Sequence, residues 1–588
     1  MTSRIVSALL FAVALAGDPA AAFEAEILTG VVKDAGGAVI AGADVEVLTA
    51  SQTSVATTRS DAQGKFSIPS LAPGSYVVVV RKAGLPEARM AVTVTAGKQA
   101  TADVTLDVVT MRDDVTVTAS KDVAEIAGRT GQPVNVITAT EIMDRAKTGV
   151  AQAVEHEVGV SLQRTSSTMN GVFVRGLTGN KVNVFVDGVR YSNGAQRGGV
   201  NTFLNLIEPA GLESIEILRG PSSDQYGSDA LGGSVQFLSK APALSSPLRG
   251  SLNITGGTAH RNAGGSLFVS GGGPKVAAAG SVSGRGVGQL RPGGGVDSHA
   301  AVTRFLGVQS NQLMGERLPN TGFSQWGSQI RFTFAPGQNT RFVTGYTHTN
   351  QDGGDRYDQL LGGDGNLISE LNDITLDIFT ARMEQIGAGP FQFLSLTYGL
   401  NSQREERVNQ GGQGSATAAI GHDPERTTSH SIVLNALRQA SQRFSFSLGG
   451  DMQFESHSSG DAFNFNPVTL VETVRRPRVP DGAKFNQGGV YATGTFDASA
   501  RFRLVGSVRY GHASYEAKAA DAKIVGGVPL WPDDSISFNG VGYRAAAILT
   551  PNDNWMVSAL VSRGFRAPHM TDLGTLGLTG SGFEVAAA

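Results

Sequence analysis

The chain has 588 residues, of which 76 are glycine and only 17% are charged, whereas average proteins contain about 7% glycine and about 25% charged residues. It contains no cysteine, which excludes disulfide scaffolds, thiolate metal sites and cysteine nucleophiles. Its net charge of -3 provides no basic field, so we expect no nucleic-acid partner.

The first residues have the pattern of an export signal. Arg4 precedes an apolar stretch over residues 5–16, and Ala20, Ala21 and Ala22 supply small residues for cleavage. The apolar stretch is shorter than the roughly 20 residues that a membrane-spanning helix needs. We therefore predict a signal peptide over residues 1–22 and an exported protein.

Residues 23–108 are expected to form a small β-sandwich. Short β-branched runs alternate with turns that contain glycine or proline. The segments that carry a family resemblance are GVVKD at 30–34, GADV at 42–45, DAQGKF at 61–66 and LAPGSY at 71–76. They resemble the carboxypeptidase regulatory-like domain, and the resemblance implies a non-catalytic sandwich that serves as an N-terminal spacer.

Residues 109–121 form a linker that contains one extended, β-branched segment. This segment comprises Asp114, Val115, Thr116, Val117, Thr118 and Ala119. A free strand of this kind can join the edge of a partner's sheet through main-chain hydrogen bonds. It resembles a TonB box, which implies contact with the energy-transducing protein TonB.

Residues 122–244 combine helices and strands, so we expect an α/β domain here. The pattern predicts a strand over residues 134–137, a helix over 140–147 capped by Thr138 or Thr140, and a second helix over 150–157. Further strands are predicted at 171–176, 182–186, 215–218 and 235–238, and Asp187-Gly188 is a strong tight-turn signal.

Four motifs in this region resemble the plug domain of TonB-dependent receptors. They read FVRG at 173–176, VFVDGVR at 184–190, ESIEILRGPSS at 213–223 and YGSDALGG at 226–233. The resemblance implies a plug that sits in the lumen of a barrel. The residues expected to seat it are Arg175, Gly176, Asp187, Gly188, Glu216, Arg219, Gly220 and Pro221.

Residues 245–588 alternate apolar and polar side chains with a period of two. Phe444, Leu448 and Phe454, for example, alternate with Ser445 and Gln453. The links are very short at 336–339, 440–442, 497–500 and 551–554, and long at 351–366 and 409–426. Short turns at one end and long loops at the other are typical of an outer-membrane β-barrel.

We count about 14 strands in this region, whereas the barrel of this receptor family has about 22. Residues 561–568 (VSRGFRAP) resemble a motif that lies well inside the family's barrel. The sequence ends in three alanines, at 586–588, and not in the aromatic residue that closes the last strand of such barrels. We therefore expect an incomplete chain. The predicted fold is mainly β, with an N-terminal β-sandwich, an α/β plug domain and a partial transmembrane antiparallel β-barrel.

The resemblance implies an outer-membrane receptor for energy-coupled uptake of a scarce ligand such as an iron-siderophore or haem. The sandwich and the TonB box would lie in the periplasm, and the partners would be TonB, outer-membrane lipid and a small extracellular ligand. A histidine follows a similar FRAP box in haem receptors, which makes His569 a candidate ligand-binding residue. Oligosaccharide and cobalamin remain open, and no cofactor is expected.

Two other classes of protein fit the sequence less well. His422 and Glu425 have the spacing of a zinc pair that His430 or His512 could complete, but they are expected in a loop without supporting residues. The sequence therefore predicts neither an enzyme nor a metal site. An exported β-rich adhesin would explain the glycine content but not the plug motifs.

Overall fold

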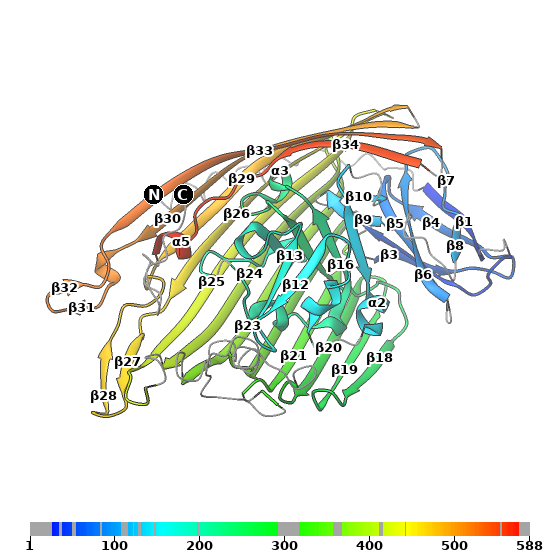
Figure 1. Ribbon diagram of the computed structural model, residues 1–588. Coiled ribbons are helices and arrows are strands. Elements are labelled where there is room, and N and C mark those ends of the chain that lie inside the picture. The colour runs from blue at the N-terminus through cyan, green and yellow to red at the C-terminus, as the bar shows by residue number, and fades with distance from the viewer. Residues whose placement is uncertain are drawn as a thin grey trace.

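The structure is a computed structural model, and the residues it describes are 26–34, 38–49, 54–82, 85–106, 116–120, 123–126, 131–145, 149–196, 199–291, 317–318, 320–337, 339–356, 367–410, 415–441, 443–499, 501–552 and 555–574. A large curved antiparallel sheet holds the plug in its hollow, and the sandwich lies at one end of this sheet (Figure 1). The expected fold class is confirmed. The signal peptide predicted for residues 1–22 lies outside the described residues.

The N-terminal sandwich consists of two small sheets. One has the order β4-β1-β7 with β8 beside β1, and the other has the order β3-β2-β5-β6. Alternate valines of β2 and β5 enter the core between them, together with Phe66. The strands are β1 Glu26–Asp34, β2 Asp44–Thr49, β3 Ser54–Arg59, β4 Lys65–Leu71, β5 Gly74–Lys82, β6 Leu85–Val94, β7 Ala100–Thr101 and β8 Val104–Leu106.

The segment that resembles a TonB box lies in a short hairpin between the sandwich and the plug. Strand β9 (Thr116–Ser120) pairs antiparallel with β10 (Val123–Ile126). The hairpin lies against β5 and β6 of the sandwich on one side and against β11 and β16 of the plug on the other.

The plug has a five-stranded sheet of order β11-β16-β17-β14-β15 and a separate β12-β13 pair. Its strands are β11 Val134–Thr138, β12 Val160–Arg164, β13 Asn170–Val174, β14 Val182–Val186, β15 Val189–Arg190, β16 Leu212–Arg219 and β17 Gly233–Ser239. Its helices are α2 Ala139–Asp144, α3 Ser223–Tyr226 and the 3-10 turns η3 Val150–Val154, η4 Gly179–Lys181, η5 Phe203–Leu206 and η6 Pro209–Gly211.

The helix predicted at 140–147 is confirmed, although it begins and ends earlier. Thr138 caps it, because its hydroxyl accepts from the Glu141 amide while the Glu141 carboxylate accepts from the Thr138 amide. The second predicted helix, at 150–157, is wrong as an α-helix. Only a 3-10 turn over Val150–Val154 forms there.

Among the described residues, the large sheet contains fifteen strands, of which β27 and β28 lie off the main series. The other thirteen form one series, close to the count of about 14 expected from the sequence. The series is β18 Arg249–Gly257, β19 Asn262–Gly272, β20 Val276–Val287, β21 Phe323–Phe334, β22 Thr340–Gly353, β23 Ile368–Ala388, β24 Phe391–Gln410, β25 Ile420–Gln439, β26 Phe444–Ser458, β29 Lys484–Ser499, β30 Phe502–Ala517, β33 Asp534–Asn552 and β34 Trp555–Arg563.

Smaller elements lie beyond the ends of these strands. They are β27 Phe463–Asn466, β28 Val471–Val474, η9 Ala519–Asp521, β31 Ile524–Val525, β32 Val528–Pro529 and α5 Met570–Gly574. No helix within the described ranges is both long enough and apolar enough to cross a lipid bilayer.

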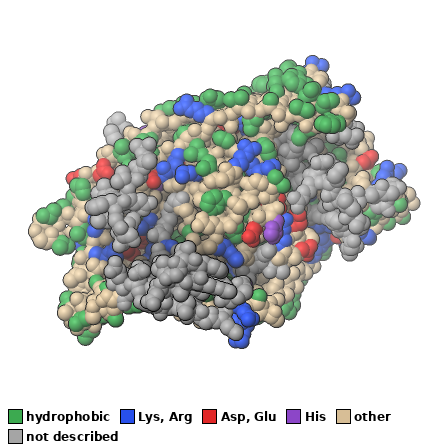
Figure 2. All heavy atoms as spheres, viewed as in Figure 1, with side chains coloured by type: hydrophobic (Ala, Val, Ile, Leu, Met, Phe, Trp, Pro, Cys, Tyr) green, Lys and Arg blue, Asp and Glu red, His purple; other side chains and the backbone are tan. Residues whose placement is uncertain are grey.

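The two faces of the large sheet differ in polarity, as the alternation predicts. In β26, Leu448, Met452 and Phe454 are exposed on the outer face, whereas Gln453 and Glu455 are buried on the face toward the plug. Hydrophobic side chains also gather along the upper edge of Figure 2, over β33 and β34. The outer face thus suits lipid and the inner face suits a polar plug.

The sandwich docks on the plug through Glu213, which begins the motif at 213–223. Arg89 donates to the Glu213 carboxylate, and Arg81 donates to the same oxygen at 2.9 Å. Arg89 is only 5% exposed and Glu213 only 9%. At the same end of the molecule, Asp44 of the sandwich lies 3.6 Å from Arg249, the first residue of β18.

Candidate functional site at the plug–barrel interface

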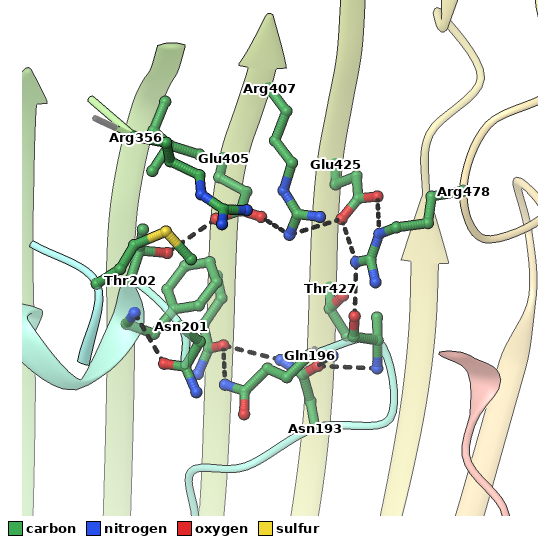
Figure 3. A pocket seen from close by; sticks show the side chains of 15 residues that line it. Asn193, Gln196, Asn201, Thr202, Arg356, Glu405, Arg407, Glu425, Thr427 and Arg478 are labelled. Atoms are coloured by element: carbon green, nitrogen blue, oxygen red, sulfur yellow. Dashed lines mark hydrogen bonds and ion pairs between the residues drawn. The ribbon is translucent and has the colours of Figure 1, made fainter. Parts of the chain in front are cut away.

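A cavity lies where a loop of the plug meets β24 and β25, near the ends of these strands that the longer loops join. Its volume is about 20 Å³. Asn193 and Gln196 of the plug loop both donate to Gln403 Oε1 of β24, at 2.8 and 2.7 Å (Figure 3). Period-two alternation directs Gln403 toward the lumen, so the cavity is lined mainly by polar groups.

Four charged side chains form a ladder along this cavity. Glu405 and Glu425 are direct cross-strand partners, an arrangement that destabilises a sheet when the like charges stay unpaired. Arg407 contacts Glu405 and lies 3.8 Å from Glu425. Arg478 binds both oxygens of Glu425, at 2.9 and 2.7 Å. Two arginines thus neutralise two buried carboxylates, and the bidentate pair fixes the geometry.

The ladder also holds the plug loop. Thr202 Oγ1 donates to Glu405 Oε2 at 2.8 Å, and Arg478 donates to the carbonyl oxygen of Ala195 at 2.7 Å. Each end of the loop is therefore bonded to a member of the ladder.

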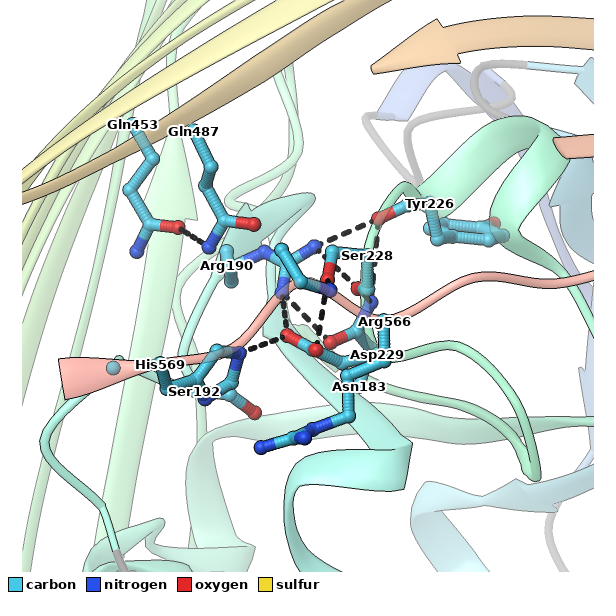
Figure 4. Close-up of polar contacts among 12 residues, drawn as sticks. Asn183, Arg190, Ser192, Tyr226, Ser228, Asp229, Gln453, Gln487, Arg566 and His569 are labelled. Atoms are coloured by element: carbon cyan, nitrogen blue, oxygen red, sulfur yellow. Dashed lines mark hydrogen bonds and ion pairs between the residues drawn. The ribbon is translucent and has the colours of Figure 1, made fainter. Parts of the chain in front are cut away.

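A second polar cluster, the clasp, consists of Arg190, Asp229 and His569 (Figure 4). Asp229 Oδ2 accepts from Arg190 at 3.0 Å and from His569 Nε2 at 2.8 Å. Burial raises the pKa of Asp229, whereas the charges and hydrogen bonds of His569, Arg190 and Ser228 lower it. The lowering effects are larger together, so the pKa of Asp229 lies below its ordinary value. Asp229 also has a φ of +79°, a conformation that costs free energy for a residue with a Cβ.

Three family models match the chain. The carboxypeptidase regulatory-like domain matches residues 27–107, the TonB-dependent receptor plug domain matches residues 127–234, and the TonB-dependent receptor-like β-barrel matches residues 299–587. The chain belongs to the TonB-dependent receptor family.

Curated relatives share a short segment with this receptor. The ferrioxamine B receptor of Salmonella typhimurium (strain SL1344) is 34% identical over 119 residues, which are 20% of this chain and 16% of that protein. The vitamin B12 transporter BtuB of Vibrio vulnificus (strain YJ016) is 32% identical over 127 residues, which are 21% of this chain and 20% of that protein. The matched segment therefore spans about a fifth or less of these relatives.

Solved structures resemble the receptor over most of its length. The copper transporter OprC has a TM-score of 0.60 at 14% identity, over 76% of this chain and 66% of that chain. The FrpB iron transporter from Neisseria meningitidis has a TM-score of 0.58 at 15% identity, over 74% of this chain and 65% of that chain. At these identities the likeness concerns the fold alone. These proteins are transporters rather than enzymes.

The segment that resembles a TonB box is only partly described. Asp114 and Val115 lie outside the described residues. Thr116, Val117, Thr118 and Ala119 lie in β9, where Thr116 is the register partner of Ile126 and Val117 that of Glu125. This strand is thus already paired within the chain.

Among the residues expected to seat the plug, Asp187 contacts the barrel. Asp187 and Gly188 have φ values of +50° and +79°, as a type I′ turn between β14 and β15 requires. The turn directs the Asp187 carboxylate to Arg331 of β21 at 2.5 Å, and the same carboxylate accepts from the Ser239 amide and hydroxyl at 2.8 Å.

The other residues expected to seat the plug lie mainly within it. Arg175 and Gly176 are exposed, and a Cβ on Gly220 would lie 2.9 Å from the Arg175 guanidinium. Burial lowers the pKa of Arg219, Arg175 lowers it further, and Glu157 opposes both effects. These arginines therefore lie beside each other.

Two of these positions reach the barrel indirectly, and one is internal. Gln132 donates to the Gly220 carbonyl at 3.1 Å and accepts from Arg544 of β33 at 3.1 Å. Pro221 lies beside Gly564, which follows β34. Glu216 is buried in the plug sheet as the register partner of Gln236.

The structure corrects the environment expected for His422 and Glu425. The predicted loop over 409–426 is wrong, because β24 continues to Gln410 and β25 begins at Ile420. His422 and Glu425 are three residues apart on β25, so their side chains point to opposite faces of the sheet. His422 contacts Glu406, whereas Glu425 binds Arg478. In the described part of the chain, no three His, Cys, Asp or Glu side chains could hold a metal ion.

Sequence reasoning missed the ladder and the clasp partner of His569. The alternation of Gln403, Glu405 and Arg407 is visible in the sequence and indicates a charged lumen-facing row. Their partner Glu425 follows only from the strand register. Asp229 lies inside a recognised motif, but its contact with His569 joins residues 340 positions apart.

We expect Glu425→Gln to destabilise the receptor, because it leaves Arg407 and Arg478 without a shared carboxylate. Removing one partner of a buried ion pair costs about 3–5 kcal/mol in the free energy of unfolding. The measurement is the midpoint of thermal unfolding in detergent. Glu406→Gln on the same sheet is the matched control, because Glu406 lies on the opposite face with His422; equal midpoints for the two variants would contradict the role of the ladder.

Proposed function

We propose that the receptor takes up a scarce extracellular ligand, such as an iron-siderophore or haem, with energy delivered through TonB. The observation that carries this proposal is the juxtaposition of a plug inside a barrel sheet with a strand-forming segment between sandwich and plug. Force applied to that segment acts directly on the plug, because β9 lies against β16 and β11.

The family and the barrel fold indicate an outer-membrane location. Short turns join β21 to β22 and β23 to β24 at the end of the sheet where β18 begins, and the sandwich docks at this end through Asp44 and Arg249. Outer-membrane barrels have short turns on the periplasmic side. The sandwich and the TonB-box segment are therefore placed in the periplasm in this proposal, and lipid contacts the outer face of the sheet.

The ligand is proposed to bind at the cavity beside the ladder, on the opposite, outward side of the plug. The amide, hydroxyl and guanidinium groups that line the cavity suit a polar ligand with oxygen atoms. Arginines that can bind in a bidentate way suit anionic oxygens in particular. Uptake of cobalamin is the alternative that a named relative favours, and uptake of an oligosaccharide is the alternative that the amide-lined wall favours.

His569 does not line this cavity. It is 3% exposed and held by Asp229, so we propose a role for it in holding the plug rather than in binding haem. We also propose that the receptor is not an enzyme, because His422 and Glu425 face opposite sides of the sheet and Glu425 is occupied by arginines.

The test is uptake into intact cells that produce the receptor. The probes are iron-loaded ferrioxamine B, haemin, cyanocobalamin and a maltooligosaccharide, each labelled. We expect accumulation of one probe, and we expect a protonophore to abolish accumulation while leaving surface binding intact. Accumulation of none, or accumulation that the protonophore does not change, would overturn the proposed function.

A further inference from the structure

The plug does not fill the lumen evenly. A cavity of about 80 Å³ separates it from the inner wall formed by β18, β19 and β20. Ile142, Met143 and Val150 of the plug line one side. This volume exceeds the roughly 10–15 Å³ that one water molecule needs, so the cavity can hold water.

The barrel wall of this cavity is made of small polar residues in register. Asn253 of β18 is the partner of Ser266 in β19, and Ser266 is the partner of Ser283 in β20. The large apolar side chains of these strands, such as Leu252 and Leu267, are exposed on the outer face. The wall therefore presents hydroxyl, amide and main-chain groups, which suit water and polar solutes.

The opposite side of the plug is packed against the barrel. A Cβ on Gly399 of β24 would lie 2.4 Å from a methyl carbon of Val189, so no side chain fits between plug and strand there. Asn401 and Gln403 of β24 both donate to the carbonyl oxygen of Tyr191 at 2.9 Å. The plug is thus tightly held on the β24 side and separated from the wall on the β18–β20 side.

A second cavity, of about 20 Å³, lies along the same wall and is lined by Ser239, Ser281 and Gln329. Glu208 lines both cavities. Its carboxylate accepts from Gln325 at 2.7 Å and lies 3.4 Å from Arg285. The constriction between the two cavities is therefore a polar contact between plug and wall.

We propose that these two cavities are the passage by which a hydrophilic solute crosses the barrel, and that Glu208 with Arg285 and Gln325 forms its gate. The inference rests on the proposed transport function, and it specifies along which side of the plug the solute moves. The plug stays against β24 during transport, and only its contact with β20 and β21 opens. Opening the constriction breaks the Glu208–Arg285 ion pair, the hydrogen bond from Gln325 to Glu208, and the hydrogen bonds that Arg285 and Gln325 donate to the Asn205 carbonyl oxygen at 3.1 and 2.9 Å.

The absence of cysteine from the chain allows disulfides to test this passage without background thiols. The first variant is Gly211→Cys with Ser281→Cys, since a Cβ on Gly211 lies 3.6 Å from Ser281 Oγ beside the second cavity. The matched control is Val189→Cys with Gly399→Cys on the packed side, where the two Cβ atoms lie 3.0 Å apart. Disulfides have Cβ–Cβ distances of about 3.5–4.5 Å, so the control pair needs a small outward shift. In the first pair the 3.6 Å distance already ends at the oxygen that the cysteine sulfur would replace.

We expect oxidation of the first pair to stop uptake of the probe that the unmodified receptor accumulates, and dithiothreitol to restore it. Oxidation of the control pair should leave the uptake rate unchanged. Uptake that stops in both oxidised variants, or continues in the first, would overturn the passage. Failure of the proposed function is distinguishable, because the reduced variants and the unmodified receptor would then also take up nothing.

A second measurement is independent of transport and of disulfide formation. Ser266→Cys lies on the passage wall, whereas Asn401→Cys lies on the packed wall. We expect a membrane-impermeant maleimide added outside the cells to label Ser266→Cys at least about ten times faster, because reaction requires access of water to the thiolate. Equal rates, or faster labelling of Asn401→Cys, would overturn the proposal.

Discussion

Deleting residues 114–119 is expected to abolish energy-dependent uptake and to leave ligand binding at the cell surface unchanged. The segment carries the only link proposed between TonB and the plug, and it lies on the sandwich side of the plug, away from the ladder cavity. Uptake should fall to the rate measured with a protonophore. The measurement is accumulation of labelled ligand in cells, with bound ligand determined separately in the cold.

A point variant separates loss of strand pairing from loss of the segment itself. Val117→Pro removes a main-chain donor and should reproduce the deletion, whereas Val117→Ala keeps the donor and should retain most of the uptake, since strand addition depends on the main chain. Normal uptake by the deletion variant would show that TonB does not act through this segment. Equal loss in the proline and alanine variants would assign the contact to side chains instead.

The paired state of β9 adds a step to this mechanism. Because β9 already bonds to β10, a partner strand has to add at the free edge of the hairpin or replace β10. Docking of the sandwich through Glu213 keeps the hairpin beside the plug. We therefore expect the sandwich to influence how readily the segment is reached, which a spacer without contacts would not do.

Local chemistry made much of the plug predictable. The Asp187-Gly188 turn follows from a sequence pair that favours positive φ at both positions, and Thr138 is a typical N-cap before a helix with Glu at the third position. The second helix failed because Val150–Val154 packs as a buried 3-10 turn, an outcome decided by tertiary contacts.

Long-range pairing explains what the sequence did not reveal in the barrel. Residues 409–426 contain glycine and proline and were expected to form a loop. Pairing of β25 with both β24 and β27 nevertheless supplies hydrogen bonds that keep this segment extended as far as Ile420. The same register places Glu425 opposite Glu405. A shift of one residue would turn Glu425 to the outer face, so no local signal could have predicted the ladder.

The clasp is expected to have a large effect on stability, which Asp229→Asn tests. This change leaves the Arg190 guanidinium, which is 8% exposed, without its carboxylate partner. Breaking a buried ion pair in this way costs about 3–5 kcal/mol in the free energy of unfolding. The control is Asp373→Asn, because the Asp373–Arg404 pair is half exposed and such pairs contribute about 0.2–1 kcal/mol.

The effect of Asp229 also has a defined dependence on pH. Its pKa in the folded receptor lies below the ordinary value of 3.8, so its ionised form is favoured by folding. The stabilisation it provides is fully present above about pH 4 and is lost as the pH falls through the folded pKa. The difference in unfolding free energy between the receptor and Asp229→Asn should therefore shrink as the pH falls below about 4. A difference that persists unchanged at pH 3, or that is no larger than for Asp373→Asn at neutral pH, would show that the carboxylate does not hold Arg190 and His569 together.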